Sequence, residues 1–272
     1  MPSFRQVKVP VYKPRQQPSI NWANPYAPGL YYALPFLDHG GLPTEIVQKA
    51  TVTQTGSPTW TNDPGINFSS VSNYYALPSW NPTTITLLIV VKGGTVNNST
   101  LTWWSRDYST TVPWAIGGYN DSVLAGMSLY SGSWYCTNVS TKQYSSTNYN
   151  DNKWHVVVGT SDGTNLRYFI DGIQQGSIAF AGNLPSNATP VYLCQYPSNT
   201  WGFTGLMSLA LAWGRALSTT DVAGLSLNPW QVFSPTLGTW NFRGATSGGA
   251  SIYSPSPYLV FPSMYFPSMI EE

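Results

Sequence analysis

Charged residues are scarce in this chain. Asp, Glu, Lys and Arg make up 8% of the 272 residues, where about 25% is typical, and the formal net charge is +1. A chain with so little net charge has no strong electrostatic preference for a partner. Four cations near the N-terminus lack a stacking platform and would bind nucleic acid only weakly. We therefore expect no nucleic-acid partner.

Carboxylates and histidines suited to catalysis are equally few. The glutamates are Glu45, Glu271 and Glu272, and the histidines are His39 and His155. Glycoside hydrolysis normally needs two carboxyl groups flanking the bond, and no spacing in this chain implies such a pair. Hairpin turns and a helix cap explain three of the aspartates: Asp162, Asp171 and Asp221. The chain also lacks a nucleophile elbow and a Gly-rich phosphate loop, so we predict that it is not an enzyme and binds no cofactor.

Cysteine is rare, and long apolar runs are missing. We interpret Cys136 and Cys194, the two cysteines, as buried free thiols rather than a disulfide. Residues 1–19 lack the apolar core and cleavage site of a secretory signal. No run approaches the ~20 apolar residues of a membrane span, so we expect no membrane insertion. A calcium loop around Asp107, Asn120 and Asp121 would lack a dense acidic cluster, and we therefore predict no metal site.

Short β-type segments and turn residues dominate the remainder. The clearest stretch is residues 152–176, which contains two successive hairpins with turns at Asp162-Gly163 and Asp171-Gly172. Alternation puts three side chains on one apolar face of its first strand: Trp154, Val156 and Val158. Such a meander needs a second sheet to cover its apolar face.

Further strands are expected between turn signals along the chain. The most apolar of them, residues 84–92, is expected at the centre of a sheet and buried on both sides. The other predicted strands are residues 29–37, 51–55, 66–68, 101–104, 114–118, 123–130, 134–139, 191–194 and 206–213. Ser218 and Asp221 have the spacing of a capping box and predict a short helix that ends near Gly224 or Asn228. The sequence therefore predicts an all-β antiparallel sandwich of two sheets with one short helix.

Three blocks of this pattern resemble the laminin-G / concanavalin A-like family. They are the meander with its Trp154-His155 opening, residues 202–225 with a closing strand, turn and helix, and residues 65–78 with an early strand pair. The resemblance covers roughly residues 20–235 and implies a concanavalin A-like jelly roll. It leaves the ligand open, because the family spans lectins, adhesion modules, glycosidases and virion proteins.

Two short segments resemble the bacteriophage branch of the same family. They are the opening Asn-Trp-Ala-Asn-Pro at residues 21–25 and the ending Asn-Pro-Trp-Gln at residues 228–231. With no signal peptide recognised, the resemblance implies a protein made in the host cytoplasm and located in the virion.

Extended N- and C-terminal arms are expected to flank the sandwich, which divides the chain into residues 1–19, 20–235 and 236–272. The first arm combines four cations with four prolines and no acid, which fits either a solvated tail or a segment that docks on an acidic protein surface. The last arm repeats Phe-Pro-Ser-Met and is too apolar for a disordered tail, so we expect it to lie in a groove of its own domain or of a neighbour. The residues expected to make assembly contacts are Arg5, Lys8, Lys13, Arg15, Tyr258, Phe261, Met264, Phe266 and Met269.

Aromatic residues are abundant, with 12 Trp and 18 Tyr. Sugar-binding sites use exposed aromatic rings beside hydrogen-bonding groups, whereas other rings of a sandwich fill its core. Alternation points one of Trp103 and Trp104 inward and the other outward. The candidate carbohydrate-binding residues are Trp103, Trp104, Tyr108, Trp114, Tyr119 and Trp134.

The two arms, the low content of charged residues and the resemblance to the bacteriophage branch together predict a non-enzymatic virion structural protein. It would be a head decoration or tail-associated component, held by its arms to other virion proteins or to copies of itself. The alternative is a carbohydrate-binding adhesin that recognises host surface glycans. A glycoside hydrolase, the third hypothesis, would require two carboxyl groups about 5–10 Å apart in a groove.

Overall fold

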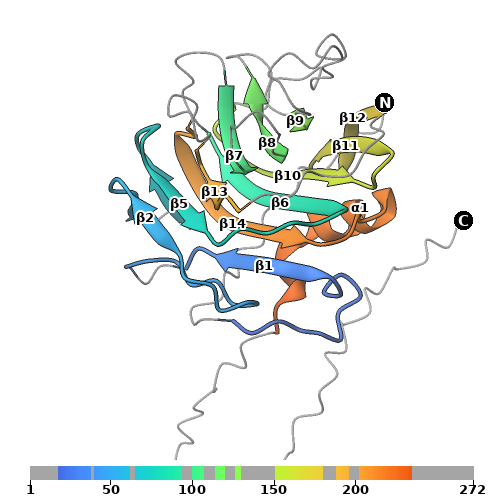
Figure 1. The fold of residues 1–272 in the computed structure, drawn as a ribbon, viewed down its shortest axis with the longest axis horizontal. Coiled ribbons are helices and arrows are strands. Elements are labelled where there is room, and N and C mark those ends of the chain that lie inside the picture. The colour runs from blue at the N-terminus through green and yellow to red at the C-terminus, as the bar shows by residue number, and fades with distance from the viewer. Residues whose placement is uncertain are drawn as a thin grey trace, which may run out of the picture. The chain divides into compact units, whose positions relative to one another are not determined.

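The computed structural model describes residues 18–37, 40–61, 65–93, 100–106, 114–119, 126–129, 151–179, 188–195 and 202–234. The chain divides into two compact units, Met1–Thr236 and Leu237–Glu272, and every described residue belongs to the first. In that unit two antiparallel sheets and a helical layer form the fold (Figure 1).

The larger sheet has eight strands, in the order β12-β11-β10-β6-β14-β4-β3, and β1 pairs with β14 beyond this path. Its strands are β1 (Leu30–Pro35), β3 (Thr59–Thr61), β4 (Gly65–Phe68), β6 (Ile85–Lys92), β10 (Trp154–Ser161), β11 (Asn165–Ile170), β12 (Ile173–Ala179) and β14 (Gly205–Trp213). Strand β6 lies between β10 and β14, and all of its residues except Lys92 are buried. The predicted position of this strand at the centre of a sheet is confirmed.

The smaller sheet has six strands, in the order β2-β5-β13-β7-β8-β9. They are β2 (Thr53–Thr55), β5 (Tyr74–Leu77), β7 (Thr100–Arg106), β8 (Trp114–Tyr119), β9 (Gly126–Leu129) and β13 (Val191–Leu193). Strand β13, far along the sequence, pairs with both β5 and β7 and so joins early segments of the chain. The predicted strand at residues 134–139 lies outside the described residues.

Both predicted hairpin turns are confirmed. Asp171 and Gly172 have φ angles of 52° and 79°, as a tight two-residue hairpin turn requires. At the other turn, Asp162 Oδ1 accepts the backbone N–H of Thr164 at 2.8 Å and that of Asn165 at 2.7 Å. These local contacts form β10, β11 and β12 into one meander.

The large sheet is buried on both faces. A first core fills the space between the two sheets and includes Phe68, Tyr75, Leu87, Trp104, Val157, Tyr168 and Met207. A second core lies on the other face of the large sheet and includes Val156, Val158, Phe169, Trp213, Val222, Leu225 and Trp230. Cys194, a fully buried free cysteine, belongs to the first core.

Helical residues cover the second core. Helix α1 (Thr219–Leu227) is followed by the 3₁₀ helix η2 (Pro229–Val232). The predicted capping box of α1 is confirmed: Ser218 Oγ accepts the Asp221 N–H, and an Asp221 carboxylate oxygen accepts the Ser218 N–H, both at 3.1 Å. No helix among the described residues has the length and apolar character needed to cross a membrane.

The prediction for the apolar face of the meander is wrong in one respect. Val156 and Val158 pack in the second core, whereas Val157, between them in sequence, faces the small sheet. Both faces of this strand are apolar, so alternation alone did not identify the face that meets the second sheet. The prediction also missed β3, while β5 lies in the block of residues 65–78 that resembles the family's early strand pair.

Candidate functional site

Part of the outer face of the six-stranded sheet, at strands β2 and β5, is open to solvent. On β2, Thr53 and Thr55 are exposed, and on β5, Tyr74 and Ala76 are half-buried. The register pairs Thr53 with Ala76 and Thr55 with Tyr74, so these four side chains share one face. A ligand can therefore reach this part of the sheet directly from solvent.

Two tyrosines form the centre of this open face. Tyr74 on β5 and Tyr192 on β13 lie edge to face, with ring centroids 5.8 Å apart and an angle of 68° between the rings. Their neighbours Tyr75 and Leu193 point the other way, into the first core. Alternation along β5 thus supplies one aromatic ring to the core and one to the outer face, and alternation along β13 supplies a leucine to the core and a tyrosine to the outer face.

The same face is closed toward β7. Ser105 pairs with Tyr192 across the strands, yet Ser105 is fully buried. Its hydroxyl donates a 2.5 Å hydrogen bond to the carbonyl oxygen of Gln195. Among the described residues, the face therefore opens gradually from β7 through the tyrosine pair to β2.

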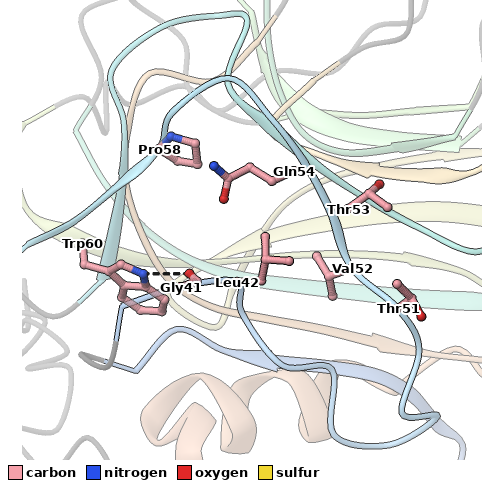
Figure 2. Close-up of a pocket in the computed structure, with 8 residues that line it drawn as sticks. All are labelled: Gly41, Leu42, Thr51, Val52, Thr53, Gln54, Pro58 and Trp60. Carbon is pink, nitrogen blue, oxygen red and sulfur yellow. Dashed lines mark hydrogen bonds between the residues drawn. The ribbon is translucent and has the colours of Figure 1, made fainter.

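A pocket lies beside β2, where this edge strand and the edge strand β3 of the large sheet come near each other (Figure 2). Its volume is about 720 Å³. The described residues that line it are Gly41, Leu42, Thr51, Val52, Thr53, Gln54, Pro58 and Trp60, and none of these carries a charge. Thr53 belongs both to the pocket lining and to the open face, so the two adjoin at the edge strand β2.

Trp60 is the aromatic wall of this pocket. Its indole N–H donates to the carbonyl oxygen of Gly41 at 2.9 Å, a bond drawn in Figure 2, and this contact fixes the orientation of the ring. Leu42 is 53% exposed, and Gln54 is also exposed. The pocket therefore combines apolar surface with hydroxyl and amide groups.

Glu45 supports the loop that forms one side of the pocket. The residue is 1% exposed, and its carboxylate accepts four backbone N–H groups: those of Ala33 (3.0 Å), Val47 (2.8 Å), Gln48 (2.8 Å) and Ala50 (3.2 Å). This satisfies a buried charge that would otherwise be costly. Glu45 thus holds residues 45–50 against β1 just before the chain enters the pocket wall.

The other described carboxylates are likewise engaged with the backbone. Each of them accepts at least one main-chain N–H: Asp151 from Lys153, Asp162 from Thr164 and Asn165, Asp171 from Val156, and Asp221 from Ser218. An Arg167 guanidinium also contacts Asp162 at 2.7 Å. These acids stabilise turns, strand ends and a helix cap.

His155 lies between two of these acids. Its Nδ1 is 2.8 Å from Asp171 and its Nε2 is 3.0 Å from Asp151, which also contacts Lys153 at 2.6 Å. Burial by itself would lower the pKa of His155, but the hydrogen bonds to the two aspartates outweigh it and raise that pKa. Burial would raise the pKa of Asp151, but its bonds to Lys153 and His155 lower it to about 2. The cluster ties the start of β10 to the turn before β12.

Of the six predicted carbohydrate-binding residues, the structure describes the side chain of one, Trp104. Trp104 is fully buried in the first core, so the prediction that its ring binds sugar at the surface is wrong. Trp103 lies at an irregularity in the β7–β8 pairing, and Trp114 and Tyr119 lie on β8. The side chains of these three residues, and all of Tyr108 and Trp134, lie outside what the structure describes.

The predicted assembly residues of both arms and Cys136 also lie outside the described part of the chain. So do Asp107 and Asp121 of the calcium loop that was considered. Within the described residues, no three His, Cys, Asp or Glu side chains gather in a way that could hold a metal ion.

Sequence reasoning missed the tyrosine pair, Trp60 and the role of Glu45. The alternation argument made for Trp103 and Trp104 applies equally to Tyr74 and Tyr75, so this signal was present. Trp60 could not be placed, because its three-residue strand has no periodicity to interpret. Glu45 gave no signal, because the amides that it binds come from β1 and from its own loop.

A model of the concanavalin A-like lectin/glucanases superfamily matches residues 69–223, which is more than half of the chain. The chain belongs to this superfamily. The predicted laminin-G and concanavalin A-like relationship is thereby confirmed, and so is the two-sheet jelly-roll fold. No curated protein sequence matches the chain.

Several solved structures share the fold at low identity. Domain 4 of AbnA, an extracellular arabinanase from Geobacillus stearothermophilus in complex with arabinotriose, aligns with a TM-score of 0.55 and 15% identity over 72% of this chain and 98% of that one. The binding domain of botulinum neurotoxin DC in complex with SialylT aligns with a TM-score of 0.54 and 11% identity over 74% of this chain and 51% of that one.

A third structure with the fold is the sialidase of Trypanosoma rangeli, with a TM-score of 0.55 and 12% identity over 73% of this chain and 32% of that one. The chain thus spans about half of the toxin domain and a third of the sialidase. At these identities the likeness shows the fold alone.

Proposed function

We propose that this protein is a non-enzymatic carbohydrate-binding domain. The observation that carries the proposal is the open outer face of the small sheet, where a half-buried tyrosine pair lies beside threonines and a pocket with a tryptophan wall. Aromatic rings next to hydroxyl and amide groups suit sugars, which have apolar C–H faces and many hydroxyl groups. Two solved structures of similar fold carry sugars, arabinotriose and SialylT.

The absence of catalysis is part of this proposal. Glycoside hydrolysis normally requires a carboxyl pair about 5–10 Å apart on either side of the bond. The described carboxylates support the proposal, because Glu45 and four aspartates all accept backbone N–H groups at structural positions. None of them lines the pocket.

A second proposal concerns the arms, which would attach the domain to a virion as a head decoration or tail-associated component. It is favoured by the unbalanced cations of residues 1–19 and by the repeated Phe-Pro-Ser-Met of the last arm. The partners would be other virion proteins or copies of this chain, and the glycan would lie on the host surface. The mass in solution of the full chain, beside that of residues 18–236, tests this proposal. We expect the full chain to assemble and the shorter one to stay monomeric, and two monomers would contradict it.

Carbohydrate binding itself is tested with a glycan array and the full-length protein. We expect binding to a restricted set of glycans and at least a tenfold loss of affinity for Tyr74→Ala, because one stacking surface is removed. Trp22→Ala is the matched control: Trp22 is 58% exposed, but its segment packs beside η2 on the far side of the large sheet. No glycan bound at all, or equal losses in both variants, would contradict the proposal.

A further inference from the structure

The candidate surface is nearly free of charge. The six strands of the small sheet contain one charged residue, Arg106 at the end of β7, and neither an acid nor a lysine. The described lining of the pocket is also uncharged. The charged residues close in sequence to this lining are Glu45, whose carboxylate is buried and accepts backbone N–H groups, the exposed Lys49, and Asp38, His39 and Asp63, which lie outside the described residues.

This composition bears on the class of sugar. Sialic acids, uronic acids and sulfated sugars carry anionic groups, which proteins recognise with Arg or Lys in charge-assisted hydrogen bonds. Hydroxyl and amide groups such as those of Thr53, Thr55 and Gln54 suit neutral hydroxyls instead.

The geometry also bears on the length of the ligand. Tyr192, Tyr74 and Thr53 lie on the adjacent strands β13, β5 and β2, which places the first and last about 10 Å apart at the usual strand spacing. Thr53 then borders the pocket, whose far wall is Trp60. One sugar ring cannot contact both the tyrosine pair and Trp60, whereas a chain that crosses the short strand β2 can.

We propose that the surface binds an uncharged glycan chain, with one part stacked on Tyr74 and Tyr192 and another part in the Trp60 pocket. This inference rests on the proposed carbohydrate binding. It goes beyond that function in naming a neutral ligand and two connected subsites.

Calorimetric titration of the full-length protein tests the ligand class. The probes are neutral arabinan, mannan and glucan oligosaccharides of increasing length, beside sialyllactose and sulfated heparin oligosaccharides. We expect a neutral series to bind, with affinity that changes less than about twofold between about 50 mM and about 500 mM NaCl, because no ion pair is screened. Stronger binding of an anionic sugar, weakened by salt, would overturn the inference and leave carbohydrate binding intact. Binding of no glycan would instead overturn the proposed function.

Variants test the two subsites. We expect a longer chain to bind about tenfold more tightly than a disaccharide, and Trp60→Ala to remove this gain. Gln54→Ala, at an exposed position of the same pocket, should reduce the gain without any effect on folding. Tyr74→Ala should weaken binding of both lengths. Equal affinity for all lengths, or a gain that survives both pocket variants, would overturn the two-subsite inference alone.

Discussion

The two sheets of this sandwich differ in what lies outside them. The large sheet has the first core on one face and the layer of α1, η2 and the N-terminal described segment on the other. The small sheet shares the first core, but between β13 and β2 its outer face reaches solvent. The difference supports the proposal that the large sheet is a scaffold and the small sheet a binding surface. The fold needs apolar side chains on both faces of the large sheet. Part of the outer face of the small sheet has no such requirement and is available for binding.

The adjacent tyrosines of β5 give the strongest test of this contrast. Tyr75 is 1% exposed in the first core, and Tyr75→Ala should lower the free energy of unfolding by about 4 kcal/mol. Tyr74→Ala, on the outer face, should cost under about 1 kcal/mol. Urea unfolding of both variants measures the difference, and similar losses would contradict the assignment of the two faces.

Removal of the Glu45 carboxylate should be nearly as damaging. Glu45→Ala leaves four backbone N–H groups without their acceptor, and we expect a loss of about 3 kcal/mol in the free energy of unfolding. Glu45→Gln keeps one acceptor oxygen and should lose less. Thermal unfolding of the two variants provides the measurement. A variant Glu45→Ala as stable as the parent would show that the loop does not depend on this carboxylate.

Two leucines of helix α1 test whether this helix covers the large sheet. Leu225 is fully buried in the second core, whereas Leu227 on the same helix is 69% exposed. We expect Leu225→Ala to cost about 2.5 kcal/mol and Leu227→Ala under about 0.5 kcal/mol. Chemical denaturation measures both. Equal effects would mean that the helix does not cover the sheet as described.

The capping box should contribute less. Ser218→Ala removes the hydroxyl that accepts the Asp221 N–H, and we expect a loss of about 1 kcal/mol, or about 3 °C in the melting temperature. Ser218→Asn retains an acceptor and should recover most of this loss. A melting temperature unchanged in Ser218→Ala would show that the cap is dispensable.

The smallest expected effect is a pH dependence from the His155 cluster. The raised pKa of His155 gives stability that is complete below about pH 6.5 and is lost as pH rises through its folded value. The pKa of Asp151, lowered from 3.8 to about 2, gives stability that is present above about pH 4 and lost as pH falls toward 2. The difference in melting temperature between the parent and His155→Gln should therefore be largest between about pH 4 and pH 6.5. We expect a difference of about 2 °C, since the groups are partly exposed. A difference that is constant with pH would contradict the assignment.

Much of the fold was predictable, because its signals are local. The Asp-Gly turns, the capping box of Ser218 and Asp221, and the apolar run of β6 each specify their own structure within a few residues. The second core was not predicted, because the valines of β10 are apolar on both faces and alternation cannot distinguish them. Glu45 accepts three N–H groups within five residues of itself, but its contact with Ala33 of β1 forms only when the chain folds.

The candidate site was less predictable than the fold. The tryptophans first favoured lie on or after β7, where Trp104 proved to be buried. The open face lies at the other edge of the sheet, and its two tyrosines are over a hundred residues apart in the sequence. Only the pairing of β13 with β5 brings them together.

Hydrogen exchange of the full-length protein with and without a bound glycan tests the central claim most directly. The proposed function assigns ligand contact to the small sheet, so we expect slower exchange in β2, β5 and β13 and in residues 40–42 near the pocket. Helices α1 and η2, which cover the large sheet, should exchange as before. Protection confined to α1, η2 or the segment around Trp22 would contradict the account.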